Sequence, residues 1–327
     1  MNCLGKDDQA LRNQTSLRFV GRWHCTEAFA VTTTPGAHFY LAYQGNDAVL
    51  HFDTQWLSRF RPHLWICVDD GPYVEAPVDR HLRVHAQTAG NHIVKVIFKS
   101  AVEVEHRWHM PLQSAICFLG FDAQAPGVLP ESKKMLVEFV GDSITEGVLV
   151  DAALGSSYFD RPYQDDSTAT YAWLTAQALG WEPVIMGYGA VGVTRGGNGG
   201  VPAAAKAYPY CFADTPITYG DVSRVIINHG ANDRASSPAA FCAGYTELLE
   251  VISAHHPQAA ITVVQPFCGV FAEELQTVIQ NFRANHSQSI ELILTEGWIP
   301  LEPLHPDREG HRKVAERLVS LLRPNNI

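Results

Sequence analysis

The spacing of apolar residues changes once along the chain, near residues 125–134. Before this point, short alternating or apolar runs are separated by turn-forming triplets such as Gly45-Asn46-Asp47, Asp69-Asp70-Gly71 and Ala89-Gly90-Asn91. Such runs, without any clear helical period, are typical of antiparallel strands. We expect strands at 39–43, 48–52, 64–68, 82–86, 92–98 and 115–121. At this spacing they predict an antiparallel β-sandwich over residues 1–125.

After the linker, strand and helix patterns alternate. Apolar runs predict strands near 135–140, 184–188, 223–228, 260–264 and 290–294, and helices are expected at about 168–179, 238–254, 271–285 and 308–322. Alternation of this kind predicts an α/β domain over residues 134–327, with a parallel sheet and helices on both faces.

The first strand of this second domain runs into a candidate nucleophile. Ser143 stands in the segment Gly141-Asp142-Ser143-Ile144-Thr145-Glu146-Gly147, directly after the apolar run 135–140. Glycines permit a tight turn at this point, and open α/β folds place their chemistry at the carboxyl ends of the strands. A serine hydroxyl reacts only with the help of a base and of donors that stabilise an oxyanion.

Three further motifs follow predicted strands. They are Gly187-Tyr188-Gly189-Ala190-Val191-Gly192, Gly230-Ala231-Asn232-Asp233 and Glu302-Pro303-Leu304-His305-Pro306. All can therefore converge on one edge of a parallel sheet. In this order, the motifs resemble those of the SGNH (GDSL-type) hydrolase superfamily over roughly residues 134–325. The resemblance implies a flavodoxin-like, three-layer α/β fold.

The resemblance also implies roles for individual residues. Ser143 would be the nucleophile and His305 the general base, and the oxyanion hole would consist of the Ser143 N–H, the Gly192 N–H and the Asn232 side-chain amide. Gly189 and the glycines of 196–200 are alternatives to Gly192.

The orienting acid departs from the family pattern. The family has Asp three residues before the histidine, whereas this chain has Glu302, which is one methylene longer. We expect Glu302 to orient His305, because such triads are defined by geometry. The alternative is a Ser143–His305 pair supported by a backbone carbonyl, as in some related carbohydrate esterases.

The N-terminal module carries a second resemblance. Gly21-Arg22-Trp23 and Gly90-Asn91-His92-x-Val94 are similar to segments of the jelly-roll-like β-sandwich that precedes the hydrolase domain in carbohydrate esterase family 2. This resemblance implies a deacetylase whose partner is an acetylated poly- or oligosaccharide. Two alternatives remain: a general short-chain esterase or lysophospholipase-like acyl hydrolase, and a carbohydrate-binding protein with a degenerate hydrolase site.

Composition narrows the classes of partner. The 327 residues carry a formal net charge of −10, with no basic stripe, which argues against nucleic acid or an anionic membrane as partner. No apolar run reaches the roughly 18 residues of a membrane-spanning helix. Residues 1–15 lack the apolar core of a signal peptide, so we expect a cytoplasmic protein or a secreted one without its leader.

The seven scattered cysteines form no CxxC pair, and we expect no metal and no cofactor. The oligomeric state stays open.

Overall fold

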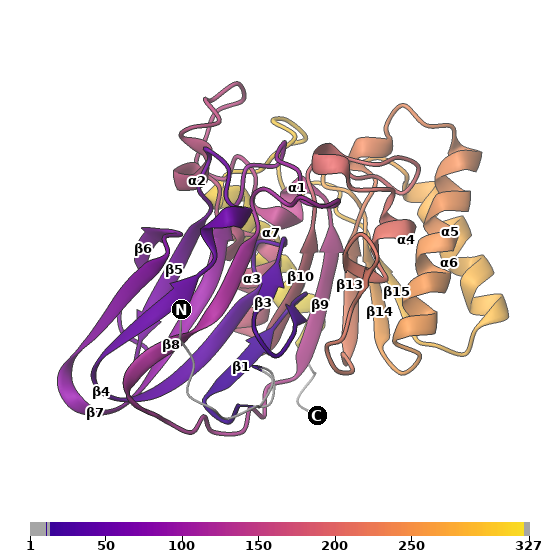
Figure 1. Ribbon diagram of the computed structural model, residues 1–327. Coiled ribbons are helices and arrows are strands. Elements are labelled where there is room, and N and C mark those ends of the chain that lie inside the picture. Colours follow the sequence, from indigo (N-terminus) through magenta and orange to yellow (C-terminus); the bar gives the residue numbers. More distant parts are fainter. Residues whose placement is uncertain (1–10, 12–13, 324–327) are drawn as a thin grey trace.

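The computed structural model describes Leu11 and residues 14–323, and the two large sheets that they form lie side by side (Figure 1). Residues 1–10 and 12–13 of the expected sandwich domain, and 324–327 of the expected hydrolase domain, lie outside the described residues. The N-terminal residues form antiparallel strands, and the C-terminal residues form a parallel sheet with helices. The predicted fold class is therefore confirmed.

The N-terminal sheet has eight strands in the order β2-β3-β8-β4-β7-β5-β6, with β1 paired to β4. All of its pairings are antiparallel. Its strands are β1 (Leu17–Val20), β2 (His24–Cys25), β3 (Ala30–Thr32), β4 (His38–Phe52), β5 (His63–Val68), β6 (Val74–Pro77), β7 (His81–Ser100) and β8 (Ile116–Pro126).

Two of the predicted turns in this sheet are wrong. The chain runs through Gly45-Asn46-Asp47 and Ala89-Gly90-Asn91, so each pair of expected strands is one long strand, β4 or β7. Gly45 pairs with Gly90, and the register between β4 and β7 shifts between Gly45 and Asp47. A glycine at positive φ (Gly45, 111°) followed by polar residues marks a β-bulge here, which bends a strand without ending it. The Asp69-Asp70-Gly71 turn between β5 and β6 is present as predicted.

The C-terminal sheet has the strand order β10-β9-β13-β14-β15, and all of its pairs are parallel. This is the flavodoxin-like order 2-1-3-4-5, whose switch point lies between β9 and β13. Its strands are β9 (Leu136–Gly141), β10 (Glu182–Gly187), β13 (Arg224–Asn228), β14 (Ala260–Val264) and β15 (Ile290–Ile293). A separate hairpin consists of β11 (Tyr210–Phe212) and β12 (Thr215–Pro216).

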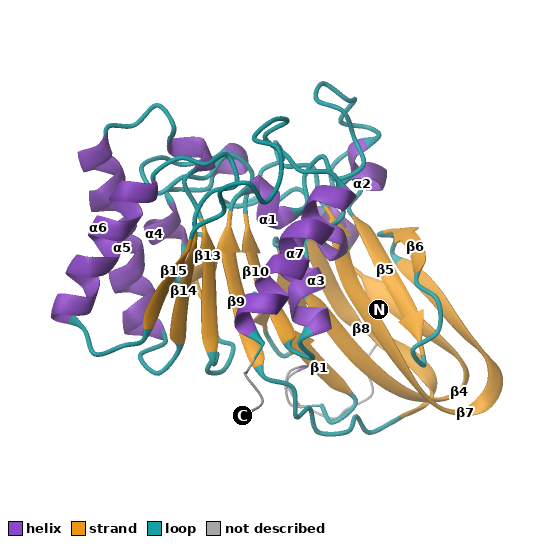
Figure 2. Cartoon of the chain, turned by 180° about the vertical axis from the view of Figure 1, so that it is seen from behind, coloured by secondary structure: helices purple, strands orange, loops and turns teal. Residues whose placement is uncertain are grey.

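Helices cover both faces of this sheet, as the alternation predicted (Figure 2). On one face, Phe139 and Ile226 pack with residues of α3 and α7; on the other, Val140 and Ile227 pack with residues of α5 and α6. The α-helices are α1 (Ser143–Glu146), α2 (Arg161–Gln164), α3 (Tyr171–Ala178), α4 (Ala204–Ala207), α5 (Pro238–His255), α6 (Ala272–Asn285) and α7 (Arg308–Leu322). Short 3-10 turns lie at Thr54–Trp56, Ser167–Ala169, Asn198–Gly200 and Ala231–Asp233.

A buried ion pair joins the two sheets. The Arg22 guanidinium donates to Glu138 of β9 at 2.8 Å, and both side chains are completely buried. Arg22 also donates to the carbonyls of Tyr208 and Tyr210, while the hydroxyls of Tyr208 and Tyr219 donate to the Glu138 carboxylate. Buried charges are tolerated only when they are paired and hydrogen-bonded, so this network binds the N-terminal module to strand β9 of the parallel sheet.

The first prediction concerns this pair. Replacing Arg22 with Met leaves the Glu138 carboxylate buried without its cation, which typically lowers the free energy of unfolding by roughly 3–5 kcal/mol. Chemical denaturation followed by fluorescence measures the change. The matched control is Arg317→Met at an exposed position on α7, for which we expect a change below about 0.5 kcal/mol. Equal stabilities of the two variants would contradict the importance of the pair.

Candidate active site

Ser143 is the first residue of α1, at the carboxyl end of β9. The Asp142 side chain caps this helix by accepting a hydrogen bond from the Ile144 N–H at 3.0 Å. Burial raises the pKa of Asp142 to about 7. At the first helical position a backbone N–H has no acceptor inside the helix. The Ser143 N–H therefore has no partner inside α1 and can donate to a group bound beside the hydroxyl of the same residue.

His305 reaches this serine from the segment between β15 and α7. Its Nε2 lies 2.9 Å from the Ser143 Oγ, so the structure brings the predicted base and nucleophile into hydrogen-bond contact. Burial of the imidazole lowers the pKa of His305 below its usual value, which favours the neutral ring that accepts a proton near pH 7. The following helix is anchored by His311, whose Nδ1 accepts from the Tyr171 N–H at 3.0 Å.

The structure does not bring Glu302 into the same contact. The Glu302 side chain is exposed, and no hydrogen bond joins it to His305 within the part of the chain that the structure describes. Leu301 and Pro303 on either side are exposed as well. The sequence position three residues before the histidine therefore does not place this carboxylate against the ring, and the orienting role predicted from the sequence has no contact to support it.

Asn232 follows β13, on the other side of the switch point from Ser143. Its side-chain Nδ2 donates to the Asp142 Oδ2 at 3.1 Å and to the Val191 carbonyl at 3.0 Å. The amide therefore lies next to the residue that precedes the nucleophile. To serve as an oxyanion donor, it must exchange one of these acceptors for the substrate oxygen.

Gly192 packs closely against the side chain of Asp233, which accepts hydrogen bonds from the next two residues. The Asp233 carboxylate accepts from the Val193 N–H at 3.0 Å and from the Thr194 N–H at 2.9 Å, and a Cβ at position 192 would come within 2.5 Å of it. Only glycine fits at this close approach. The Gly192 N–H itself donates to the Arg195 carbonyl at 3.0 Å, so its predicted oxyanion role likewise requires an exchange of partner.

Residues of the N-terminal module also reach this edge of the sheet, which the sequence motifs did not indicate. Arg107 forms a buried ion pair with Glu146 of α1 at 2.6 Å. Glu103 accepts a hydrogen bond from Asn198 at 3.2 Å and lies 3.7 Å from Arg161. These side chains lie outside every recognisable motif, and their position depends on packing between the sheets.

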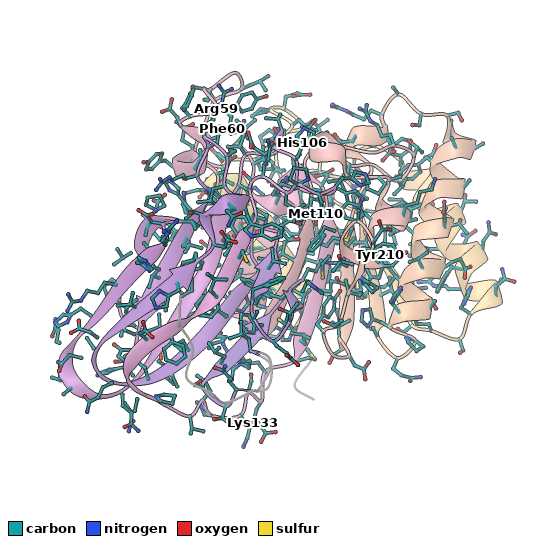
Figure 3. The ribbon with its side chains drawn as sticks, in the orientation of Figure 1. Arg59, Phe60, His106, Met110, Lys133 and Tyr210 are labelled. Atoms are coloured by element: carbon teal, nitrogen blue, oxygen red, sulfur yellow. The ribbon has the colours of Figure 1, made fainter. Side chains whose placement is uncertain are left out.

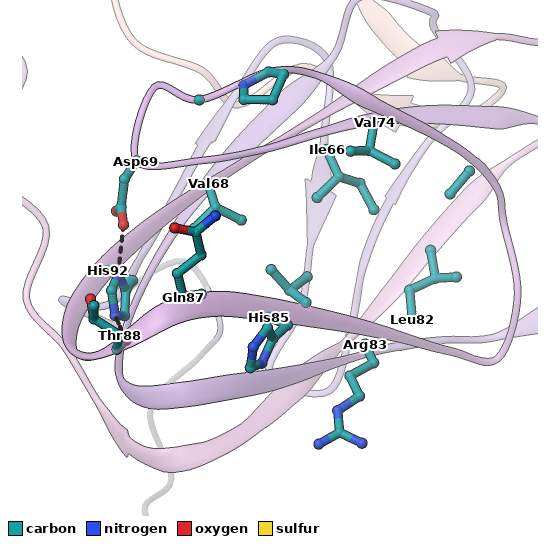
Figure 4. Close-up of a pocket in the computed structure, with 15 residues that line it drawn as sticks. Ile66, Val68, Asp69, Val74, Leu82, Arg83, His85, Gln87, Thr88 and His92 are labelled. Carbon is teal, nitrogen blue, oxygen red and sulfur yellow. Dashed lines mark hydrogen bonds and ion pairs between the residues drawn. The ribbon is translucent and has the colours of Figure 1, made fainter.

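A hollow of about 600 Å³ lies elsewhere, between the β5–β6 hairpin and the first half of β7 (Figure 4). Its lining is mainly aliphatic, with the His92–Asp69 pair at one end. Neither Ser143 nor His305 lines it, so this hollow is separate from the candidate active site.

The described residues contain neither a cluster that could hold a metal ion nor a helix that could span a membrane. Within Leu11 and residues 14–323, no group of three or more His, Cys, Asp and Glu side chains is arranged to hold a metal ion. Over the same residues, no helix combines the length and apolarity needed to cross a bilayer.

Comparisons with known proteins agree with this architecture. Residues 139–318 match the GDSL-like lipase/acylhydrolase family. No curated protein matches the chain.

Solved structures match over nearly the full length. A family two carbohydrate esterase from Clostridium thermocellum, in complex with cellohexaose, is 20% identical with a TM-score of 0.75, covering 93% of this chain and 97% of its own. A family two carbohydrate esterase from Cellvibrio japonicus is 18% identical with a TM-score of 0.77, covering 96% of both chains. An acetyl xylan esterase from Butyrivibrio proteoclasticus is 16% identical with a TM-score of 0.76, covering 96% of this chain and 97% of its own. At these identities the likeness shows the shared fold.

The second prediction tests Glu302. Because its carboxylate is exposed and not bonded to His305, we expect Glu302→Gln to keep kcat within about threefold of the wild type. His305→Ala, which removes the base itself, should lower kcat by several orders of magnitude, and steady-state kinetics on an activated ester measure both. A loss of more than about tenfold in the Gln variant would instead support the orienting role.

The third prediction tests Asn232. If its amide serves the oxyanion, Asn232→Ala should lower kcat by roughly 10²–10³ with little change in KM, because the donor is needed mainly in the transition state. Asn232→Asp is the matched control, since it keeps the shape but replaces the NH₂ with an acceptor, and it should be equally impaired. A rise in KM alone would make Asn232 a substrate-binding residue.

Proposed function

The chain belongs to the GDSL-like lipase/acylhydrolase family, and on this premise we propose that it is a serine esterase that removes O-acetyl groups from carbohydrate. The observation that carries the proposal is the 2.9 Å contact between the His305 Nε2 and the Ser143 Oγ. A hydroxyl with a neutral imidazole as its acceptor, at the carboxyl end of a strand, is the arrangement required for nucleophilic attack on an ester.

The reaction proceeds in two halves. Ser143 Oγ attacks the ester carbonyl while its proton passes to the His305 Nε2, and the tetrahedral oxyanion is stabilised by the Ser143 N–H and the Asn232 amide, with the Gly192 N–H as the third donor. His305 then returns the proton to the leaving sugar oxygen, which leaves an acetyl group on Ser143. Water, deprotonated by His305, attacks this acyl-enzyme, and acetate and free Ser143 result.

Two features support carbohydrate as the alcohol part of the substrate. The structural neighbours include a carbohydrate esterase bound to cellohexaose and an acetyl xylan esterase. In addition, Tyr158, Phe159 and Tyr163 are 42%, 61% and 61% exposed. Arg308 stands at the start of α7, three residues after the candidate base His305, and donates hydrogen bonds to Asp151. This contact joins α7 to the connection that carries the three aromatic residues. Aromatic faces of this kind suit the apolar faces of sugar rings.

The N-terminal module supports these aromatic side chains. The Phe60 ring lies 4.9 Å from Phe159, centroid to centroid, and the Arg59 guanidinium lies 4.6 Å from the Phe60 ring. Arg59 and Phe60 are at the end of the N-terminal sheet that lies next to α2 (Figure 3). The loop after β9 therefore packs against the first module, which favours a fixed surface for the substrate.

Two other functions are distinguishable. A general short-chain esterase or lysophospholipase-like hydrolase would use the same serine and histidine, but its acyl pocket would accept longer chains. A carbohydrate-binding protein with a degenerate site would bind sugar without turnover, and the exposed position of Glu302 is the observation that favours this reading.

The fourth prediction is the substrate panel that tests the proposal. We expect release of acetate from acetylated xylan or glucomannan, clear preference for acetyl over butyryl nitrophenyl esters, and almost no octanoyl turnover, because extra methylenes overpack a small acyl pocket. Ser143→Ala is the control and should keep less than about one part in a thousand of the rate. Comparable octanoyl rates would support the general hydrolase, and no turnover of any ester would overturn the esterase proposal.

A further inference from the structure

The connection after α1 forms a loop whose two ends meet beside the candidate nucleophile. The Asp151 N–H donates to the Gln164 carbonyl at 3.1 Å, which closes the loop at its neck. Just outside the neck, the Asp166 N–H donates to the Gly147 carbonyl at 3.0 Å. The N–H of Gly147 in turn donates to the Ser143 carbonyl at 3.1 Å. The neck of this loop is therefore bonded to the helix that begins with Ser143.

Arg308, the first residue of α7, binds a carboxylate on each side of this neck. Its Nε and one terminal nitrogen donate to the two oxygens of Asp151, both at 2.6 Å. The same terminal nitrogen donates to the Asp166 Oδ2 at 3.0 Å. A planar guanidinium that meets a carboxylate through two parallel bonds is fixed in direction as well as in distance. The start of α7 is therefore joined to the neck by three charge-assisted hydrogen bonds.

The Asp166 carboxylate is the buried end of this arrangement. Its side chain is 2% exposed. Its Oδ1 accepts from the Trp65 Nε1 at 3.2 Å, and from the N–H and hydroxyl of Thr168 at 2.9 and 2.7 Å. Trp65 stands in β5, so the N-terminal module also binds the neck. A buried carboxylate that uses both oxygens in this way cannot shift without breaking several bonds, which makes it a fixed point for Arg308.

The candidate base stands on the segment that Arg308 fixes. His305 lies three residues before Arg308, and only Pro306 and Asp307 separate them. Pro306 is buried, and its ring restricts the backbone. The Asp307 side chain caps α7 by accepting from the Gly310 N–H at 2.8 Å. This short and restrained connection makes the position of the imidazole depend on the position of the first turn of α7.

The segment before the base is held less firmly. Residues 301–303 are exposed, and Leu304 is only partly buried. Among the described residues, the one hydrogen bond of the His305 ring is that with the Ser143 Oγ. In other serine hydrolases a carboxylate bonded to the histidine orients the ring. Without such a contact, the direction of this ring depends on where its segment is anchored, and Arg308 anchors that segment to the nucleophile side.

We propose that Arg308, through Asp151 and Asp166, is a positioning residue that holds His305 against Ser143. The inference rests on the proposed esterase function. Transfer of the Ser143 proton to the His305 Nε2 requires the two atoms to stay within hydrogen-bond reach. A displacement of about 1 Å in such an arrangement costs roughly 100-fold in rate. Arg308 takes no part in the proton transfer, and it acts by fixing the segment that carries the base.

The fifth prediction compares Arg308→Met with Arg312→Met. Arg312 is the matched control, because it lies one turn further along α7, is equally half exposed, and donates two bonds to Glu309 of its own helix. On nitrophenyl acetate, which contains no sugar, Arg308→Met should lower kcat roughly ten- to hundredfold at nearly unchanged KM. Arg312→Met should stay within about twofold of the wild type. Equal kcat values for the two variants, or a rise in KM alone, would overturn the proposal.

A double-mutant cycle tests whether Arg308 acts through the neck. Asp151→Asn removes the carboxylate that binds the guanidinium through two bonds, so it should lower kcat in the same way as Arg308→Met. The double variant should be no slower than the slower single variant, because both changes remove one contact. Losses that multiply in the double variant would mean that the two side chains act independently, and they would refute the role given to this pair.

Crystal structures of the same variants measure the position of the base without turnover. In Arg308→Met, the distance between the His305 Nε2 and the Ser143 Oγ should exceed about 3.2 Å, or the ring should occupy more than one position. In Arg312→Met, the distance should stay at 2.9 Å. An ordered ring at the unchanged distance in Arg308→Met would overturn the inference. If the wild type turned over no ester, the esterase proposal would fail, while these structures would still decide whether Arg308 positions His305.

Discussion

The buried ion pair between Arg107 and Glu146 is the interaction on which the architecture of the candidate site depends. Glu146 is the last residue of the short helix that Ser143 begins, and Arg107 comes from the connection after β7. Both side chains are almost completely buried, and burial raises the pKa of Glu146 to about 7 in spite of the neighbouring guanidinium. Removing either side chain would leave the other charge buried without its partner, at a cost of several kcal/mol.

This constraint changes how the N-terminal module is understood. It pairs with the second sheet at Arg22–Glu138, contributes Arg107 beside the nucleophile helix, and supplies Glu103 as an acceptor for Asn198 in the connection after β10. A detachable accessory domain would contact its neighbour through a small and more polar surface. The two modules of this protein instead share buried charges, so the candidate active site is built by both.

Local patterns predicted the C-terminal sheet well and the N-terminal strands less well. The spacing of apolar residues, together with the residues at each end, located β9, β13, β14 and α7 within a few residues of their observed bounds. Each of these elements is a single run whose spacing of apolar residues indicates its secondary structure. In β4 and β7 the same reasoning placed turns at glycine-rich triplets. A turn and a bulge have similar residues, and what separates them is whether a partner strand continues alongside, as β4 and β7 do for one another across Gly45 and Gly90.

The sequence alone determined the chemistry of the candidate site: a serine after a strand, a histidine before the last helix, and an asparagine after a third strand. These residues meet because parallel strands present their carboxyl ends at one edge, and the 2.9 Å contact between His305 and Ser143 follows from that rule. Only the tertiary structure decided where Glu302 and the charged side chains of the N-terminal module lie. Glu302 is close to His305 in sequence yet exposed to solvent, whereas Arg107 is distant from Glu146 in sequence and forms a buried ion pair with it in the nucleophile helix. Electrostatic influence depends on distance and burial in space, and no spacing along the chain encodes either quantity.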